Sequence, residues 1–224
     1  MTRGILIVGI DSSLPEAVAV EAGKRVEQYA AAFIFNRLLD SVRERPQPVD
    51  RGKARISLDW NPGSPISART LVLAAENRLE HIDEAILICT PPSVRRPVEE
   101  LAPADIDIAV NDHIKGWFFL VKELTAGFKA RNAGTLALVL SDSPKNGGGS
   151  EPNLLGPSVS ASFRAFVQGL LDASLDKPYQ TLAFSSEPGE DAEFAAYIFK
   201  IIEENNKRNT GRWHKYGRLG LFKR

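Results

Sequence analysis

The sequence predicts one α/β domain built on a doubly wound parallel sheet with helices on both faces. Short apolar runs alternate with longer segments of helical periodicity along nearly the whole chain. The first run, Gly4 to Gly9, is continuously apolar, as strands buried on both faces of a parallel sheet are. With 43% hydrophobic and 25% charged residues over 224 positions and no internal repeat, residues 1–224 are expected to form a single globular domain.

The elements follow in order from local signals. After the first strand, Ser13, Pro15 and Glu16 mark a helix start, where Ser13 and Glu16 are expected to form a capping box. Apolar residues at helical spacing extend this helix toward Pro46: Val26, Tyr29, Ala30, Phe33, Ile34 and Leu38. A polar loop then leads to a weak strand at 54–58 and a turn-rich piece at 59–65. The rest alternates as helix 67–79, strand 85–89, helix 108–128, strand 136–140, helix 160–175, strand 179–184 and helix 192–205.

Charge and composition exclude several classes of protein. Lys plus Arg and Asp plus Glu each number 28, so the net charge gives no general attraction to nucleic acid or anionic lipid. No apolar run reaches the roughly 18 residues of a membrane span, and the first apolar run is too brief for a signal peptide. The single cysteine, Cys89, excludes an internal disulfide and a cysteine-based zinc site, and the three histidines lie far apart. We therefore expect a cytoplasmic protein without a metal.

The turn after the first strand is the first place to look for a ligand, because open α/β sheets bind ligands at the carboxyl ends of their strands. A dinucleotide site needs several glycines there, but this turn keeps only Gly9. Pro15 removes a backbone donor, and Asp11 and Glu16 place carboxylates where a phosphate would lie. The local charge therefore opposes phosphate.

Four segments in the right order carry a resemblance to a known family. They are the stretch from Asn111 to Gly116, the strand that ends in Ser141, the sequence Ser-Ala-Ser-Phe-Arg-Ala at 160–165, and the Thr-Gly segment at 209–213. In these the chain resembles the short-chain dehydrogenase/reductase family, a single-domain Rossmann-type fold. The resemblance implies an NAD or NADP cofactor and leaves Ser141 and Asn111 as remnants of the catalytic set. The cofactor would lie against Gly9, Asp11, Ser12, Ser13, Asp59 and Thr90.

The chain departs from the family where the chemistry lies. The Tyr-x-x-x-Lys pair falls on Val159 and Phe163, and a valine cannot be a general acid. The family's Asn-Asn-Ala-Gly stretch is replaced by residues 89–92, and little room remains before Ala54 for the usual second strand and helix. We therefore expect a degenerate member that has lost hydride transfer, binds a nicotinamide cofactor weakly or not at all, and acts as a binding or scaffold protein.

The sequence leaves alternatives open. One is an NAD(P)-dependent oxidoreductase with displaced catalytic groups, and a serine–lysine pair built from Lys145 with Ser141, Ser143 or Ser158 is a less favoured variant. Cys89 is expected to be a buried small hydrophobe rather than a reactive thiol. Asn111 is expected to cap the long helix, and His113 alone is weak evidence for a site.

The helices at 108–128 and 160–175 are expected to form a homodimer. The first carries five apolar residues in a row from Trp117 to Val121, so it must be covered on both sides. The resemblance implies a helical bundle across a two-fold axis, with Phe119, Phe163 and Phe166 as interface candidates; the alternative is that the C-terminal tail covers these faces.

The tail at 207–224 holds seven Lys or Arg residues among aromatic ones. A last strand with a tail docked on the sheet edge or on a partner subunit is favoured there over a nucleic-acid-binding segment.

Overall fold

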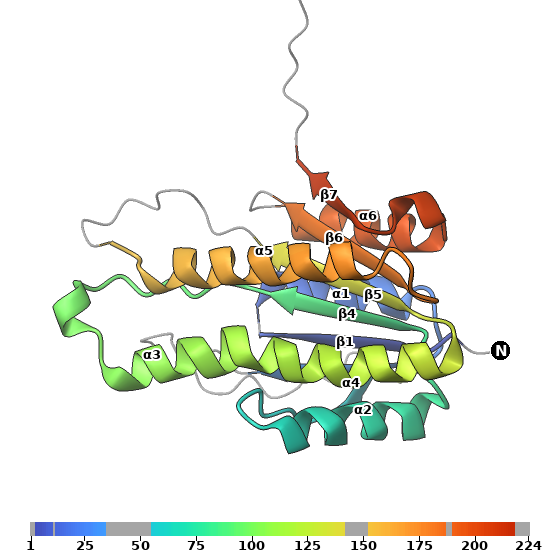
Figure 1. Ribbon diagram of the computed structural model, residues 1–224, viewed down its shortest axis with the longest axis horizontal. Helices are drawn as coiled ribbons and strands as arrows, with labels where there is room; N and C mark the ends of the chain where they lie inside the picture. Colours follow the sequence, from blue (N-terminus) through green and yellow to red (C-terminus); the bar gives the residue numbers. More distant parts are fainter. Residues whose placement is uncertain (1–2, 11, 35–54, 142–151, 187–189, 218–224) are drawn as a thin grey trace, which may run out of the picture.

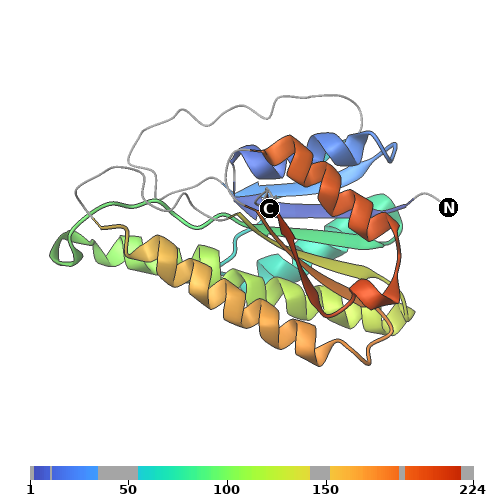
Figure 2. The same ribbon diagram turned by 90° about the horizontal axis from the view of Figure 1, so that it is seen from above.

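The computed structural model describes residues 3–10, 12–34, 55–141, 152–186 and 190–217, and these ranges form a seven-stranded, wholly parallel sheet (Figures 1 and 2). The strands lie in the order β3-β2-β1-β4-β5-β6-β7. They are β1 (Ile5–Ile10), β2 (Tyr29–Ile34), β3 (Arg55–Ser57), β4 (Glu84–Cys89), β5 (Thr135–Ser141), β6 (Gln180–Ser186) and β7 (Arg212–Tyr216). The predicted doubly wound sheet is therefore confirmed, and its strand order reverses direction between β1 and β4.

Helices cover both faces of this sheet. Alternate residues of each central strand point to opposite faces, so Leu6 and Val8 of β1 join one apolar core while Ile5 and Ile7 join the other. The first core is closed by α2 (Pro65–Leu79), α4 (Gly116–Arg131) and α5 (Leu155–Ala173). The second is closed by α1 (Ser13–Gly23) and α6 (Asp191–Glu203). Figure 2 shows the two layers on either side of the strands.

The long helix predicted at 108–128 is longer than expected. α3 (Pro103–Val110) continues through one π-helical turn, η2 (Asn111–Lys115), directly into α4, with helical backbone angles at both junctions. Asn111 therefore lies inside a continuous helix, and the prediction that it caps this helix is wrong. The start is set instead by Pro103, where Asp105 Oδ2 accepts a 3.1 Å hydrogen bond from the backbone N–H of Ala102.

The second strand was not predicted from the sequence. The predicted first helix ends at Gly23, and residues Tyr29–Ile34 form β2 between β1 and β3. The strand that the sequence left no room for is therefore present. Its three alanines, at positions 30 to 32, are buried on both faces, where small side chains fit between α1 and α2. Leu38, where the predicted helix continued, lies outside the described residues.

The C-terminal segment confirms the predicted last strand. β7 pairs in parallel with β6 at the sheet edge, and the Tyr216 hydroxyl donates a 2.9 Å hydrogen bond to Glu193 on α6. Arg164 of α5 lies over the Trp213 ring at 5.6 Å. The rest of the predicted tail, 218–224, lies outside the described residues. Two short 3-10 turns complete the described elements, η1 (Val98–Glu100) and η3 (Lys207–Asn209). In the described part of the chain, no helix is both long and apolar enough to span a bilayer.

Candidate functional site

The carboxyl ends of β1 and β4, where the strand order reverses, bring two predicted site residues together. Ser12 follows β1 and Thr90 follows β4, and their hydroxyl oxygens lie 3.2 Å apart. Ser12 also donates to the carbonyl oxygen of Ile10 at 3.2 Å. These two hydroxyls are half-buried and mark the crevice in which an open α/β sheet binds its ligand.

The first turn of α1 differs from the predicted capping box. Ser12 is the N-cap and its side chain makes no cap hydrogen bond, while Ser13 is exposed. Glu16 instead receives Arg55 Nη1 at 3.0 and 3.2 Å. The capping box is wrong because an arginine distant in sequence reaches the same carboxylate. Arg55 brings a cation to the helix start, and Glu16 already neutralises it.

Gly9 has a packing role at this turn. A Cβ atom at Gly9 would lie 2.9 Å from Pro15 Cγ, so the strand must carry glycine for α1 to pack closely on it. Asp11, the remaining predicted residue of the turn, lies outside the described residues. Pro15 is buried against the strand and offers no N–H to a ligand.

The positions expected to carry the proton-transfer pair face the apolar interior. Val159 and Phe163 lie on the inner face of α5 and are 1% and 2% exposed. The Phe163 ring meets the edge of Trp117 at a centroid distance of 5.9 Å, and Trp117 lies 5.4 Å from Trp60. Three aromatic rings from α4, α5 and the loop after β3 therefore fill the space beside these positions. We call Trp60, Trp117 and Phe163 the aromatic cluster.

Two buried titratable groups on this side of the sheet, His113 and Cys89, are uncharged at neutral pH. His113 in the π-helical turn is buried, and its burial lowers its pKa to about 4. Its Nδ1 has no hydrogen-bond partner among the described residues. Cys89, at the end of β4, is completely buried, and burial raises the pKa of its thiol, as expected for a structural cysteine. Neither group is poised to exchange a proton with a ligand near pH 7.

Ser141 lies at the same carboxyl edge as Thr90, because the residues directly before them, Leu140 of β5 and Cys89 of β4, pair across the two strands. Asn111 lies against Gly63 and accepts a 3.3 Å hydrogen bond from Lys115 Nζ. Asp59 is exposed just beyond β3. Ser143 and Lys145, the predicted serine–lysine alternative, lie outside the described residues. In the described ranges, no three His, Cys, Asp or Glu residues are grouped closely enough to hold a metal ion.

The loop after β4 carries a feature that the sequence analysis missed. Asn153 donates from Nδ2 to the Pro92 carbonyl at 3.1 Å and accepts from the Gly156 N–H at 3.0 Å. Arg95 pairs with Asn153 through an antiparallel bridge. This clamp fastens the loop after β4 onto the first turn of α5, and only an asparagine before a helix start hinted at it in the sequence.

Known proteins resemble this chain in structure but not in sequence. A scan against protein-family models finds no match, and no curated protein matches in sequence. Solved structures do match. A short-chain dehydrogenase/reductase family oxidoreductase from Aeromonas hydrophila gives a TM-score of 0.77 at 16% identity, covering 96% of this chain and 98% of its own. The chain has the short-chain dehydrogenase/reductase fold.

Two further structures extend this likeness over the whole chain. A 3-oxoacyl-reductase from Bacillus thuringiensis gives a TM-score of 0.74 at 10% identity, with 97% of each chain covered. An NADH-dependent reductase complexed with NAD gives 0.71 at 16% identity, covering 96% of this chain and 95% of that one. The Ser12–Thr90 crevice and the aromatic cluster therefore both lie within the part of the chain that shares the fold of these reductases.

Proposed function

We propose that this chain keeps the short-chain dehydrogenase/reductase fold without the family's hydride-transfer chemistry and acts as a binding or scaffold protein. The observation that carries the proposal is the burial of Val159 and Phe163 at the positions of the family's tyrosine and lysine. A buried valine and phenylalanine can neither give a proton to a carbonyl oxygen nor lower the pKa of a group that does.

The surroundings of these two positions support the same conclusion. The aromatic cluster occupies the space beside them, and the nearby thiol and imidazole are uncharged at neutral pH. The turn before α1 offers few free N–H groups to a pyrophosphate, because Pro15 has none. Loss of the proton donor and of the phosphate cradle together favours a protein that does not turn over a nicotinamide cofactor.

The alternative is an NAD(P)-dependent oxidoreductase with displaced catalytic groups, and the paired hydroxyls of Ser12 and Thr90 favour it. Oxidation of NADH and NADPH with a panel of ketones separates the two. We expect no cofactor-dependent turnover from the wild-type chain. Turnover that disappears in Ser141→Ala and in Asn111→Ala, while folding is retained, would establish the oxidoreductase instead.

We further propose that the protein is a homodimer through the outer faces of α4 and α5. Phe118 on α4 is 52% exposed and lies 4.2 Å from the Phe166 ring on α5, measured between centroids. Three small exposed residues follow one another every four positions on α5: Ala161, Ala165 and Gly169. Such a stripe lets a partner helix approach closely. Phe163, an expected interface residue, is buried within the protomer and is excluded from this surface.

We place the protein in the cytoplasm, since its one cysteine is a free thiol buried in the core. Nucleic acid is not a proposed partner, because the net charge is zero and Arg212 and Lys215 lie on a sheet-edge strand rather than in a continuous basic groove.

A further inference from the structure

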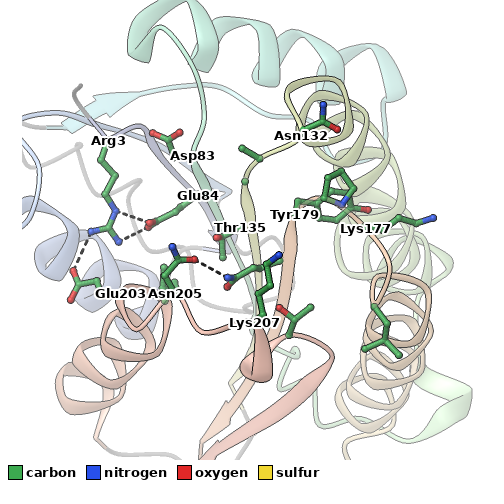
Figure 3. A pocket seen from close by; sticks show the side chains of 17 residues that line it. Arg3, Asp83, Glu84, Asn132, Thr135, Lys177, Tyr179, Glu203, Asn205 and Lys207 are labelled. Carbon is green, nitrogen blue, oxygen red and sulfur yellow. Dashed lines mark hydrogen bonds and ion pairs between the residues drawn. The ribbon is translucent and has the colours of Figure 1, made fainter.

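A cavity of about 600 Å³ lies at the amino edge of the sheet, opposite the Ser12–Thr90 crevice. Its floor is formed where β4, β5 and β6 begin, at Glu84, Thr135 and Gln180. Its walls come from the loops that follow α4, α5 and α6 (Figure 3). This volume lies within the range of small-molecule sites, which is roughly 300 to 1,000 Å³.

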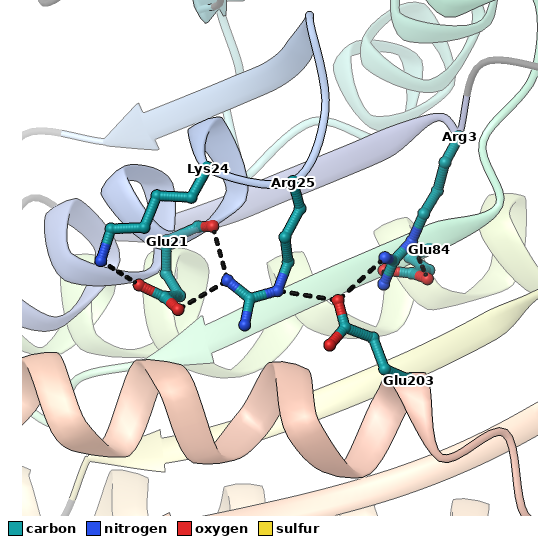
Figure 4. A network of polar contacts seen from close by, with 6 residues as sticks. All are labelled: Arg3, Glu21, Lys24, Arg25, Glu84 and Glu203. Carbon is teal, nitrogen blue, oxygen red and sulfur yellow. Dashed lines mark hydrogen bonds and ion pairs between the residues drawn. The ribbon is translucent and has the colours of Figure 1, made fainter.

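Every acidic side chain of the cavity already has a cationic partner. Glu84, buried to 8% exposure, receives Arg3 at 2.6 and 2.8 Å, and burial raises its pKa. Glu203 accepts from Arg3 at 3.1 Å and from Arg25 at 2.8 Å (Figure 4). Asp83 Oδ1 lies 3.8 Å from Arg131 Nη1, and Asp83 Oδ2 accepts the Gly4 N–H at 2.9 Å. The acids therefore leave no strong attraction for a cationic ligand.

Two lysines of the cavity are left without such a partner. Lys177 and Lys207 form no ion pair with any described residue, and both are exposed. In Figure 3 the side chain of Lys207 lies toward the middle of the lining residues, whereas that of Lys177 starts at the outer rim and extends away from the other residues drawn. The unpaired charge of the cavity is therefore positive, which favours an anionic group in the ligand.

One side of the same cavity is apolar. Leu175 is 65% exposed and lines the cavity with Pro178 and Tyr179. The Tyr179 ring packs against the Phe128 ring, and the two ring centroids lie 5.9 Å apart. An anion with an apolar body would cover this surface while its charge meets the lysines.

We propose that this cavity binds a small organic carboxylate with an apolar body. Its carboxylate lies beside the Lys207 ammonium group, with Lys177 adding charge at the rim, and its apolar part packs on Leu175 and Tyr179. The inference is independent of the proposed function, because the cavity and the crevice lie at opposite edges of the sheet and share no residue.

The test uses benzoate as the probe and benzamide, its uncharged counterpart, as the matched ligand. Backbone amide shifts of the full chain are followed by NMR in the wild type, Lys207→Gln, Lys177→Gln and Lys200→Gln, an exposed charge-matched control on α6 outside the cavity. We expect benzoate to shift the amides of Thr135 and Gln180. Each cavity variant should weaken its binding by about two- to fivefold, as loss of one exposed ion pair does.

Other outcomes overturn the proposal. Equal binding of benzamide would show that charge is not recognised, and equal loss in Lys200→Gln would show a diffuse electrostatic effect. Shifts confined to the Ser12–Thr90 edge, or none at millimolar benzoate, would exclude this cavity as the site. The two lysines also lie beyond the C-terminal ends of α5 and α6. If they only stabilise these helix ends, both variants will lower the melting temperature and leave benzoate binding unchanged.

Discussion

At the scale of the residue, the buried side chain of His113 makes the stability of the folded protein depend on pH. Unfolded imidazole takes up a proton near pH 6.5, but the buried side chain does so only near pH 4. The unfolded chain therefore binds more protons throughout this window, so stability falls as pH drops from 6.5 toward 4 and is fully present above 6.5.

His113→Phe, which keeps a buried ring, should remove this pH dependence. The wild type should lose up to about 3 kcal/mol of unfolding free energy relative to the variant across the window. Urea unfolding of both proteins at several pH values measures the difference, and taking the difference cancels carboxylates such as Glu84, whose raised pKa acts in the opposite direction. Parallel pH profiles for the two proteins would contradict the assignment.

Phe163→Lys should be strongly destabilising if the aromatic cluster is a packed core rather than an open site. The substitution removes a ring in contact with Trp117 and buries an ammonium group, and we expect a loss of about 3 to 5 kcal/mol in unfolding free energy. Gln168→Lys, on the exposed face of the same helix, is the control and should change stability little. A well-tolerated lysine at 163 would mean that an open, polar cleft adjoins it.

The sequence predicts part of this site and not the rest, for a physical reason. The apolar character of Val159 and Phe163 is visible in the chain, so the proposed loss of the proton-transfer pair can be inferred from the sequence alone. The Trp60 ring beside Trp117, and the Arg55–Glu16 pair, join residues 57 and 39 positions apart. Periodicity and local capping signals cannot report such contacts, which only the folded sheet creates.

At the scale of the element, β2 shows where local signals fail. Residues 29–34 read Tyr-Ala-Ala-Ala-Phe-Ile, and alanine has the highest helix propensity of all residues. Parallel pairing with β1 and β3 overrides that propensity. β1 and β4 were predicted correctly, because both are continuous apolar runs that a central parallel strand requires.

The two glycines of α5 should respond in opposite directions to alanine. A Cβ at Gly156 would lie 2.4 Å from the Pro92 carbonyl oxygen, so Gly156→Ala should cost about 1 to 3 kcal/mol by breaking the Asn153 clamp. Gly169 has open space, and Gly169→Ala should stabilise by about 0.5 to 1 kcal/mol. Thermal unfolding measures the effect of each substitution. Both are made in a chain that also carries Phe118→Glu, which is expected to be monomeric, so that changes at the proposed dimer interface do not contribute. Effects of the same sign would refute the clamp.

Phe118→Glu should dissociate the proposed homodimer without unfolding the protomer, because this half-exposed ring contributes little to the protomer core. Sedimentation velocity should show a dimer for the wild type and a monomer for the variant. Leu73→Glu, at a similarly exposed apolar position on α2, is the matched control and should remain dimeric. If the wild-type protein sediments as a monomer, the proposed homodimer through α4 and α5 does not form.

At the scale of the whole molecule, the fold is shared with reductases, and we propose that the chemistry is not. The full-length likeness to reductase structures persists at 10–16% identity, since the two apolar cores on either side of the sheet specify the architecture. The two positions expected to carry the proton-transfer pair, Val159 and Phe163, belong to one of these cores as apolar side chains, so the fold is kept without a tyrosine and a lysine there. We propose that the carboxyl edge of the strands neither holds nor uses a nicotinamide cofactor.

The most direct test is titration of the purified wild-type protein with NADH and NADPH, following cofactor fluorescence and melting temperature together. We expect no fluorescence change and no rise in melting temperature up to millimolar cofactor. Saturable binding at micromolar concentration, with the melting temperature rising as a ligand specific to the folded state requires, would contradict this proposal and establish a working cofactor site beside Ser12 and Thr90.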